Sequence, residues 1–211
     1  RPGDSYNDIY TGWTYPPKDY AKWSELCYQL TRHFVEKYGS REVESWWFEV
    51  WNEPDIGYWH GTPDEYMKLY DFAADGLKRA VPTARIGGPE VTGPNGARTQ
   101  MILRNFLEHC LRGTNYATGK TGSPLDLVTF QDHSYNPQFL DTVTLLTYAA
   151  SKTSRIQLAG NVLNLPLRDP VELARSIASL DRLSGERIEL GIGAGAFWDG
   201  IGTMGGRKLT A

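Results

Sequence analysis

The chain has 211 residues and a formal net charge of −3, with 40% hydrophobic and 22% charged residues, a composition typical of a soluble globular protein. Because there is no basic stripe, nucleic acid is not expected as a partner. No apolar run approaches the roughly 18 residues of a membrane span, so no membrane partner is expected either. The start, Arg1 to Asp4, has no Met and no signal-peptide pattern, which indicates an internal or processed piece and leaves the localisation unknown.

Cysteine, histidine and aromatic residues narrow the chemistry further. Cys27 and Cys110 are isolated and each falls in a helical pattern, so we expect buried free thiols. The four histidines are scattered without an HxxxH pair, and we therefore predict no metal site. Aromatic residues make up 12% of the chain, which suits a sugar-binding cleft but suits core packing equally well.

In the first half, apolar residues at spacings of three and four predict helices over residues 18–38, 62–81 and 98–112. The first helix should bury one apolar stripe, which consists of Tyr20, Trp23, Leu26, Leu30 and Phe34. Thr62 and Glu65 have the spacing of a capping box and should open the second helix. Short apolar runs predict strands at residues 46–51 and 85–89, and residues 1–17 should form a loop.

In the second half, strands are predicted at residues 125–130, 155–162 and 187–193, and helices at residues 138–152 and 169–184. The tail, residues 194–211, is rich in Gly and shows no clear periodicity. Strict alternation of about five strands and five helices predicts an α/β fold of the (β/α) TIM-barrel type. A closed barrel needs about eight such units, so we expect an incomplete barrel, an open sheet, or a homo-oligomer that completes the barrel.

The strand at residues 46–51 runs into Asn52-Glu53-Pro54, which places Glu53 at the carboxyl end of a strand. In α/β proteins this is where catalytic groups lie. An apolar wall such as Trp51 favours the protonated form of a carboxyl, which a general acid needs. The alternative is a Glu that ends a strand or pairs with a basic side chain. Glu49 lies four residues deeper and could orient Glu53 or be a buried ion-paired residue.

Residues from about 6 to 128 resemble glycoside hydrolase family 39, the family of β-xylosidases and α-iduronidases. The matching stretches are Gly12-Trp13, Pro16-Pro17-Lys18-Asp19-Tyr20, Phe48 to Asp55, Tyr58-Trp59, Ile86-Gly87-Gly88-Pro89 and Asn105 to Cys110. The resemblance implies retaining hydrolysis of a xyloside or related sugar, with a carbohydrate as partner and no cofactor. It makes Glu53 the acid/base, gives Asn52 the sugar 2-hydroxyl, and adds Trp51 and His133 as substrate contacts.

Residues from about 126 to 211 resemble a luciferase-like, flavin- or deazaflavin-dependent monooxygenase. The matching stretches are Thr153 to Leu158, Asn161 to Pro170, Ser179 to Gly185 and Gly191 to Asp199. The resemblance implies FMN or F420 as cofactor, with Asp132 and Asn161 lining its site. His133 fits either family, and a loop His bonded to the backbone is the third interpretation. The phosphate-binding strands of this family are later ones that the sequence lacks.

The chain therefore looks chimeric, with its seam near residues 124–133. We expect a single barrel-like domain, residues 1–211, made of a glycosidase-like segment (1–125) and a luciferase-like segment (126–211). The nucleophile of family 39 comes from a later strand that is absent, so hydrolysis should be slow or absent. Glu90 follows another strand and is a geometric candidate for that role. A flavin-dependent oxidoreductase and a non-catalytic chimeric or designed barrel fragment are the alternatives.

Overall fold

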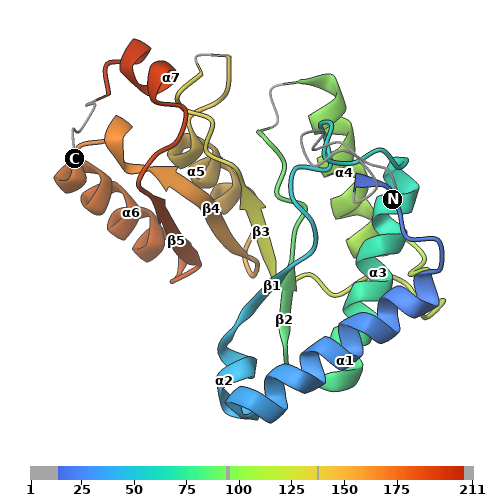
Figure 1. Ribbon diagram of the computed structural model, residues 1–211. Coiled ribbons are helices and arrows are strands. Elements are labelled where there is room, and N and C mark those ends of the chain that lie inside the picture. Colours follow the sequence, from blue (N-terminus) through green and yellow to red (C-terminus); the bar gives the residue numbers. More distant parts are fainter. Residues whose placement is uncertain (1–13, 94–95, 137, 207–211) are drawn as a thin grey trace. The chain divides into compact units, whose positions relative to one another are not determined.

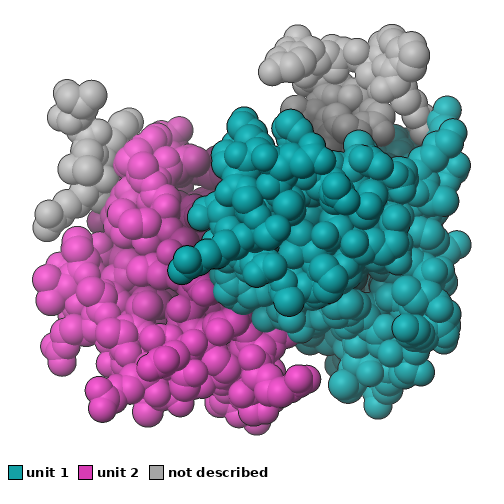
Figure 2. Space-filling view, turned by 90° about the horizontal axis from the view of Figure 1, so that it is seen from below, with its two compact units in different colours: residues 1–89, 101–126 teal, residues 90–100, 127–211 magenta. Residues whose placement is uncertain are grey.

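The computed structural model of the chain describes residues 14–93, 96–136 and 138–206. The chain divides into two compact units, which are coloured separately in Figure 2. The first unit comprises residues 1–89 and 101–126, and the second comprises residues 90–100 and 127–211. The main border lies one residue from the boundary predicted between the two segments. That one domain spans the whole chain stays a prediction.

The first unit holds two strands and the helices around them (Figure 1). In chain order its elements are α1 (Tyr20–Tyr38), α2 (Ser40–Ser45), β1 (Trp47–Glu49), α3 (Pro63–Ala80) and β2 (Arg85–Gly87), followed by most of α4 (Ala97–Arg112). β1 and β2 are parallel, with Phe48 opposite Ile86. Both strands therefore end on the same side of this unit.

The second unit holds three parallel strands. Its elements are β3 (Leu127–Phe130), α5 (Thr142–Lys152), β4 (Gln157–Asn164), the short 3-10 turn η2 (Leu165–Leu167), α6 (Pro170–Ser184), β5 (Ile188–Gly193) and α7 (Trp198–Thr203). β4 pairs with β3 and with β5, and its register with β5 shifts between Gly160 and Leu163. Within the described residues, five strands thus alternate with helices, as the sequence predicts.

Two short helices were not predicted. α2 and α7 have six residues each, which is too short for a hydrophobic period to show. α7 forms in the Gly-rich tail because Ile201 is fully buried and fixes the segment against the rest of the unit. The loop predicted for residues 1–17 falls mostly outside the described residues.

The buried stripe predicted for α1 is wrong at two positions. Leu26 is 57% exposed and Leu30 is 48% exposed. α1 and α3 run beside each other (Figure 1), and a methyl group at Gly76 of α3 would collide with the backbone oxygen of Ser24. Such a close approach needs small residues, so Ser24 and Thr31 occupy the buried face.

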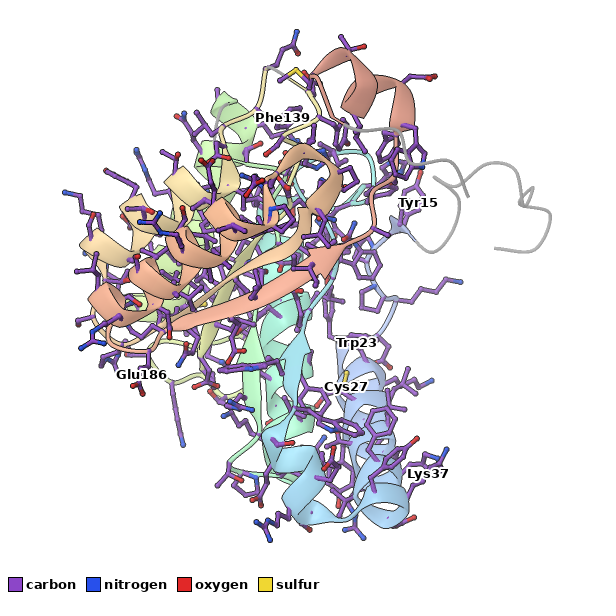
Figure 3. The ribbon with its side chains drawn as sticks, turned by 90° about the vertical axis from the view of Figure 1, so that its left-hand side faces the viewer. Tyr15, Trp23, Cys27, Lys37, Phe139 and Glu186 are labelled. Carbon is purple, nitrogen blue, oxygen red and sulfur yellow. The ribbon has the colours of Figure 1, made fainter. Side chains whose placement is uncertain are left out.

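Polar contacts join α1 to α3 on this face. The indole nitrogen of Trp23 donates to the Leu69 carbonyl (3.0 Å), and the Ser24 hydroxyl donates to Asp75 (2.8 Å). Trp23 and Cys27 lie along α1 in Figure 3. Cys27 is a half-buried free thiol, not a fully buried one, whereas Cys110 is buried as expected. Burial raises the pKa of Cys27 to about 11, so its thiol stays protonated at neutral pH.

The capping box that opens α3 is confirmed. The Thr62 hydroxyl accepts from the Glu65 N–H (3.2 Å), and the Glu65 carboxylate accepts from the Thr62 N–H (2.7 Å). Asp169 caps α6, accepting from the N–H groups of Val171 and Glu172. The first cap fixes the residue at which the loop after β1 must end.

Candidate functional site

The loop between β1 and α3 carries three of the predicted site residues, Trp51, Asn52 and Glu53. Glu53 is buried, with 4% of its surface exposed, although it follows a strand tip. Its φ is +46° and that of Trp51 is +73°, in the left-handed region that non-Gly residues rarely adopt. Such backbone costs on the order of 1–3 kcal/mol per residue and is found where the surroundings enforce it, often at functional sites.

Aromatic side chains hold this loop in place. The indole nitrogen of Trp51 donates to the Tyr58 carbonyl (2.9 Å), and the Trp51 ring meets that of Trp59 edge-on at 5.4 Å. Trp59 in turn meets Tyr66 of α3 at 6.0 Å, and the Tyr66 hydroxyl donates to the Val50 carbonyl (2.9 Å). The loop is therefore anchored at both ends, which fixes the backbone that carries Glu53.

The residue that follows β2, Gly88, lies against the Tyr66 hydroxyl, which also holds the loop. Gly88 has a φ of +155°, and a side chain there would lie 3.1 Å from the Tyr66 hydroxyl. Only Gly fits this position without displacing the hydroxyl that holds Val50. Glu90, the geometric candidate for a nucleophile, belongs to the second unit, where it is buried and has a φ of +48°.

Asp132, His133 and Asn161 lie in the second unit. Asp132 follows β3 and is 4% exposed. Its carboxylate accepts from the Thr142 hydroxyl (2.9 Å), from the backbone and side-chain nitrogens of Asn164 (2.7 and 3.3 Å), and from Ser134. Arg168 adds a charged donor at 3.4 Å. These donors fill the acceptor capacity of a carboxylate.

The pKa of Asp132 is set by opposing effects. Burial alone would raise it, but the hydrogen bonds from Asn164 and Ser134 and the positive charge of Arg168 together lower it below its usual value. Asp132 is therefore an anion that joins β3 to β4 and α5. Because its oxygens are occupied by protein donors, the cofactor contact predicted for it finds no support here and stays a prediction.

The lowered pKa of Asp132 predicts acid sensitivity. A carboxyl whose pKa is depressed by folding stabilises the native state above its unfolded pKa of about 3.9, and this contribution is lost as the pH falls through the native value. We expect the melting temperature to fall between about pH 5 and pH 2. Asp132→Asn should be less stable at neutral pH and should fall less steeply in acid. Parallel acid limbs for the two proteins would contradict this assignment.

His133 lies in an aromatic group at the tip of β3. Its Nδ1 is 2.7 Å from the Tyr135 hydroxyl, and its ring stacks on Phe139 at 4.8 Å. Tyr135 stacks on Phe197 at 4.9 Å and 23°. In Figure 3, Phe139 lies at the opposite end of this unit from Glu186, which precedes β5. The group is thus at the carboxyl ends of the strands, where the sequence places the site.

Asn161 lies on β4, between Gly160 and Leu163, where the register with β5 is irregular. It is half-buried. A local break of this kind takes a residue out of the regular ladder and re-aims its side chain.

The structure therefore places Trp51, Asn52 and Glu53 on one loop of the first unit, and Asp132, His133 and Asn161 near strand ends or irregularities of the second.

A buried polar cluster in the first unit was missed by the sequence analysis. Asp71 of α3 is fully buried and accepts from His109 Nε2 (2.9 Å), from the Tyr116 N–H (2.7 Å) and from the Ser123 hydroxyl. The available signal was a carboxylate in the middle of the buried stripe of α3. Ser, His and Asp occur together, but the same His nitrogen faces both partners, unlike a hydrolase triad, in which His bridges them.

Two protein families match different parts of the chain. Glycosyl hydrolases family 39 matches residues 3–165, and the luciferase-like monooxygenase family matches residues 124–209. The two resemblances and the chimeric interpretation are thereby confirmed. Across the part of the chain that the structure describes, no helix is both long and apolar enough to cross a membrane.

Known relatives agree with the first match. A β-xylosidase of Caldicellulosiruptor saccharolyticus is 33% identical over 72% of this chain and 29% of its own length. A β-xylosidase of Geobacillus stearothermophilus is 42% identical over 51% of this chain and 21% of its own length. The solved structure of a family 39 β-xylosidase from Caulobacter crescentus has a TM-score of 0.59 at 25% identity and covers 86% of this chain and 40% of its own.

The chain thus spans less than a third of the length of these two curated relatives. The shared fold with a family 39 structure confirms the predicted class, an incomplete α/β barrel of the (β/α) type.

Proposed function

The chain belongs to glycosyl hydrolase family 39, and from this we propose that it carries the acid/base half of a retaining glycosidase site, with Glu53 as that group. The observation that carries the proposal is the setting of Glu53. It is a buried carboxyl on the loop that follows β1, with a left-handed backbone that an aromatic network enforces. A precisely held carboxyl is what general acid catalysis requires.

In the proposed reaction, Glu53 gives its proton to the glycosidic oxygen as the bond from that oxygen to the anomeric carbon breaks. The alcohol leaves, and the carboxylate later takes a proton from the water that attacks the anomeric carbon. Asn52 would bind the sugar 2-hydroxyl. Trp51 would offer only its ring to the sugar, because its indole N–H is already bonded to the Tyr58 carbonyl. His133 is a further proposed substrate contact.

The substrate class we propose is a xyloside, in keeping with the names of the relatives. A retaining enzyme also needs a second carboxyl as nucleophile. The family's nucleophile strand has no counterpart in this sequence, so we propose slow turnover.

The proposal is tested by the hydrolysis of phenyl β-xyloside, whose leaving group is poor enough to need a proton from Glu53. Wild type, Glu53→Gln and a control, Glu44→Gln, are compared. Glu44 is exposed on α2 of the same unit and lies outside the site loop. The proposal requires wild type and the control to be alike and Glu53→Gln to be slower. Equal rates for all three proteins would refute it.

A second candidate function rests on the match of residues 124–209 to luciferase-like monooxygenases. FMN or F420 would supply hydride chemistry in such an enzyme. The residues named for it fit poorly, since the oxygens of Asp132 are occupied by protein donors, and Asn161 alone remains as a proposed contact.

Titration of FMN with the whole chain tests this candidate. We expect no saturable quenching of flavin fluorescence, because the carboxylate of Asp132 is already paired with donors within the protein. Saturable quenching that Asn161→Ala weakens would favour the oxidoreductase instead. Sizing in the same buffer tests the proposed homo-oligomer, and a cooperative melt without either activity would favour a non-catalytic fragment.

A further inference from the structure

Phe197 is an exposed aromatic residue that stacks on the half-buried Tyr135. Phe197 is 67% exposed, yet its ring is not loose, because it stacks on Tyr135 at 4.9 Å and 23°. Its φ is +57°, a left-handed conformation that is costly for a bulky side chain. An exposed ring contributes little to core packing, so packing does not explain the strained backbone that holds Phe197 in place.

Tyr135 is held firmly beneath that ring. Its hydroxyl is 2.7 Å from Nδ1 of His133, whose own ring stacks on Phe139. On the other side, α7 approaches so closely that a side-chain carbon at Gly200 would lie 3.2 Å from the Tyr135 carbonyl oxygen. Phe197 precedes α7, so the contact at Gly200 fixes the helix that presents Phe197. Both rings are therefore pre-positioned at the tip of β3.

We propose that Phe197 and Tyr135 form a stacking platform for a sugar ring. Sugars present apolar C–H faces that pack on aromatic rings, and an exposed ring beside polar groups suits such a ligand. The polar groups here are the Tyr135 hydroxyl and the imidazole of His133. The ligand class, a xylose-type pyranose, rests on the proposed function.

The platform goes beyond the family assignment. Phe197 lies outside the stretch that matches glycosyl hydrolases family 39, which ends at residue 165, and falls within the luciferase-like match. Tyr135 lies where the two matches overlap. The ring pair thus joins one residue inside the family 39 match to one beyond it.

The test is a titration of the whole chain with xylobiose, followed by NMR of the sugar protons. Phe197→Leu keeps an apolar side chain but removes the ring face, so we expect about fivefold weaker binding. Phe197→Trp should restore or strengthen binding. Leu183→Ala is the control, because Leu183 is exposed on α6 and apolar but away from the platform. Melting temperatures confirm that each variant is folded.

Three results would overturn the platform. The first is no xylobiose binding by wild type, and the second is unchanged binding in Phe197→Leu. The third is tighter binding in that variant, which would mean that Phe197 covers a sugar site. The proposed function is judged separately, by hydrolysis in wild type and Glu53→Gln. If Glu53→Gln slows hydrolysis but Phe197→Leu leaves xylobiose binding unchanged, the platform alone is refuted. If Phe197→Leu weakens binding but Glu53→Gln hydrolyses like wild type, the proposed function alone is refuted.

Discussion

Replacing Glu53 by Gln should lower the turnover of phenyl β-xyloside, whose poor leaving group needs a proton, about 100- to 10,000-fold, the range by which a positioned acid or base accelerates a reaction. Gln has nearly the shape of Glu, so the loop of Trp51 and Trp59 should keep its form while the transferable proton is lost. The effect should appear in kcat more than in KM, because proton transfer occurs only in the transition state.

Two control measurements accompany this experiment. The melting temperature of Glu53→Gln should stay close to that of wild type, which separates lost chemistry from lost structure. Glu44→Gln on α2 should hydrolyse the xyloside like wild type. A wild-type rate equal to the uncatalysed rate, or a Glu53→Gln rate equal to wild type, would remove Glu53 from the catalytic role.

The largest effect on stability is expected from Asp71→Ala. The substitution leaves the Tyr116 N–H, His109 and Ser123 without their shared acceptor inside the first unit. Leaving buried polar groups without a hydrogen-bond acceptor in this way typically lowers the free energy of unfolding by about 3–5 kcal/mol. Urea unfolding followed by Trp fluorescence measures it. Six of the seven Trp residues lie in residues 1–89, so the signal reports chiefly on this unit.

Asp64→Ala is the matched control for this change. Asp64 is exposed in the first turn of the same helix, α3, where a carboxylate contributes about 1 kcal/mol or less through the helix dipole. If Asp71→Ala lowers the free energy of unfolding no more than Asp64→Ala does, the cluster around Asp71 does not stabilise the unit.

Much of the fold could be predicted from local patterns. The capping box of Thr62 and Glu65 lies where the sequence indicates, because a cap depends on residues within one turn. The buried face of α1 was mispredicted for the opposite reason. Which face packs is decided by Gly76 on another helix, and its close approach selects Ser24 and Thr31 over Leu26 and Leu30.

In the site, too, local features could be predicted from the sequence and long-range contacts could not. That Glu53 follows a strand tip could be read from the Trp-rich run and Pro54, since both are local signals. The contacts of Asp132 with Thr142, Asn164 and Arg168 could not be read from the sequence, because these three donors lie 10 to 36 residues away. Nor does any local signal give the stacking of Tyr135 on Phe197, which are far apart in the sequence.

The most direct test of the central proposal, that Glu53 protonates the leaving group, is the rate of hydrolysis across a series of aryl β-xylosides with leaving phenols of rising pKa. In wild type, the rate should depend weakly on the phenol, because Glu53 supplies its proton. In Glu53→Gln, the rate should fall steeply as the phenol becomes a poorer leaving group. The same slope in both proteins would contradict the proposed role of Glu53.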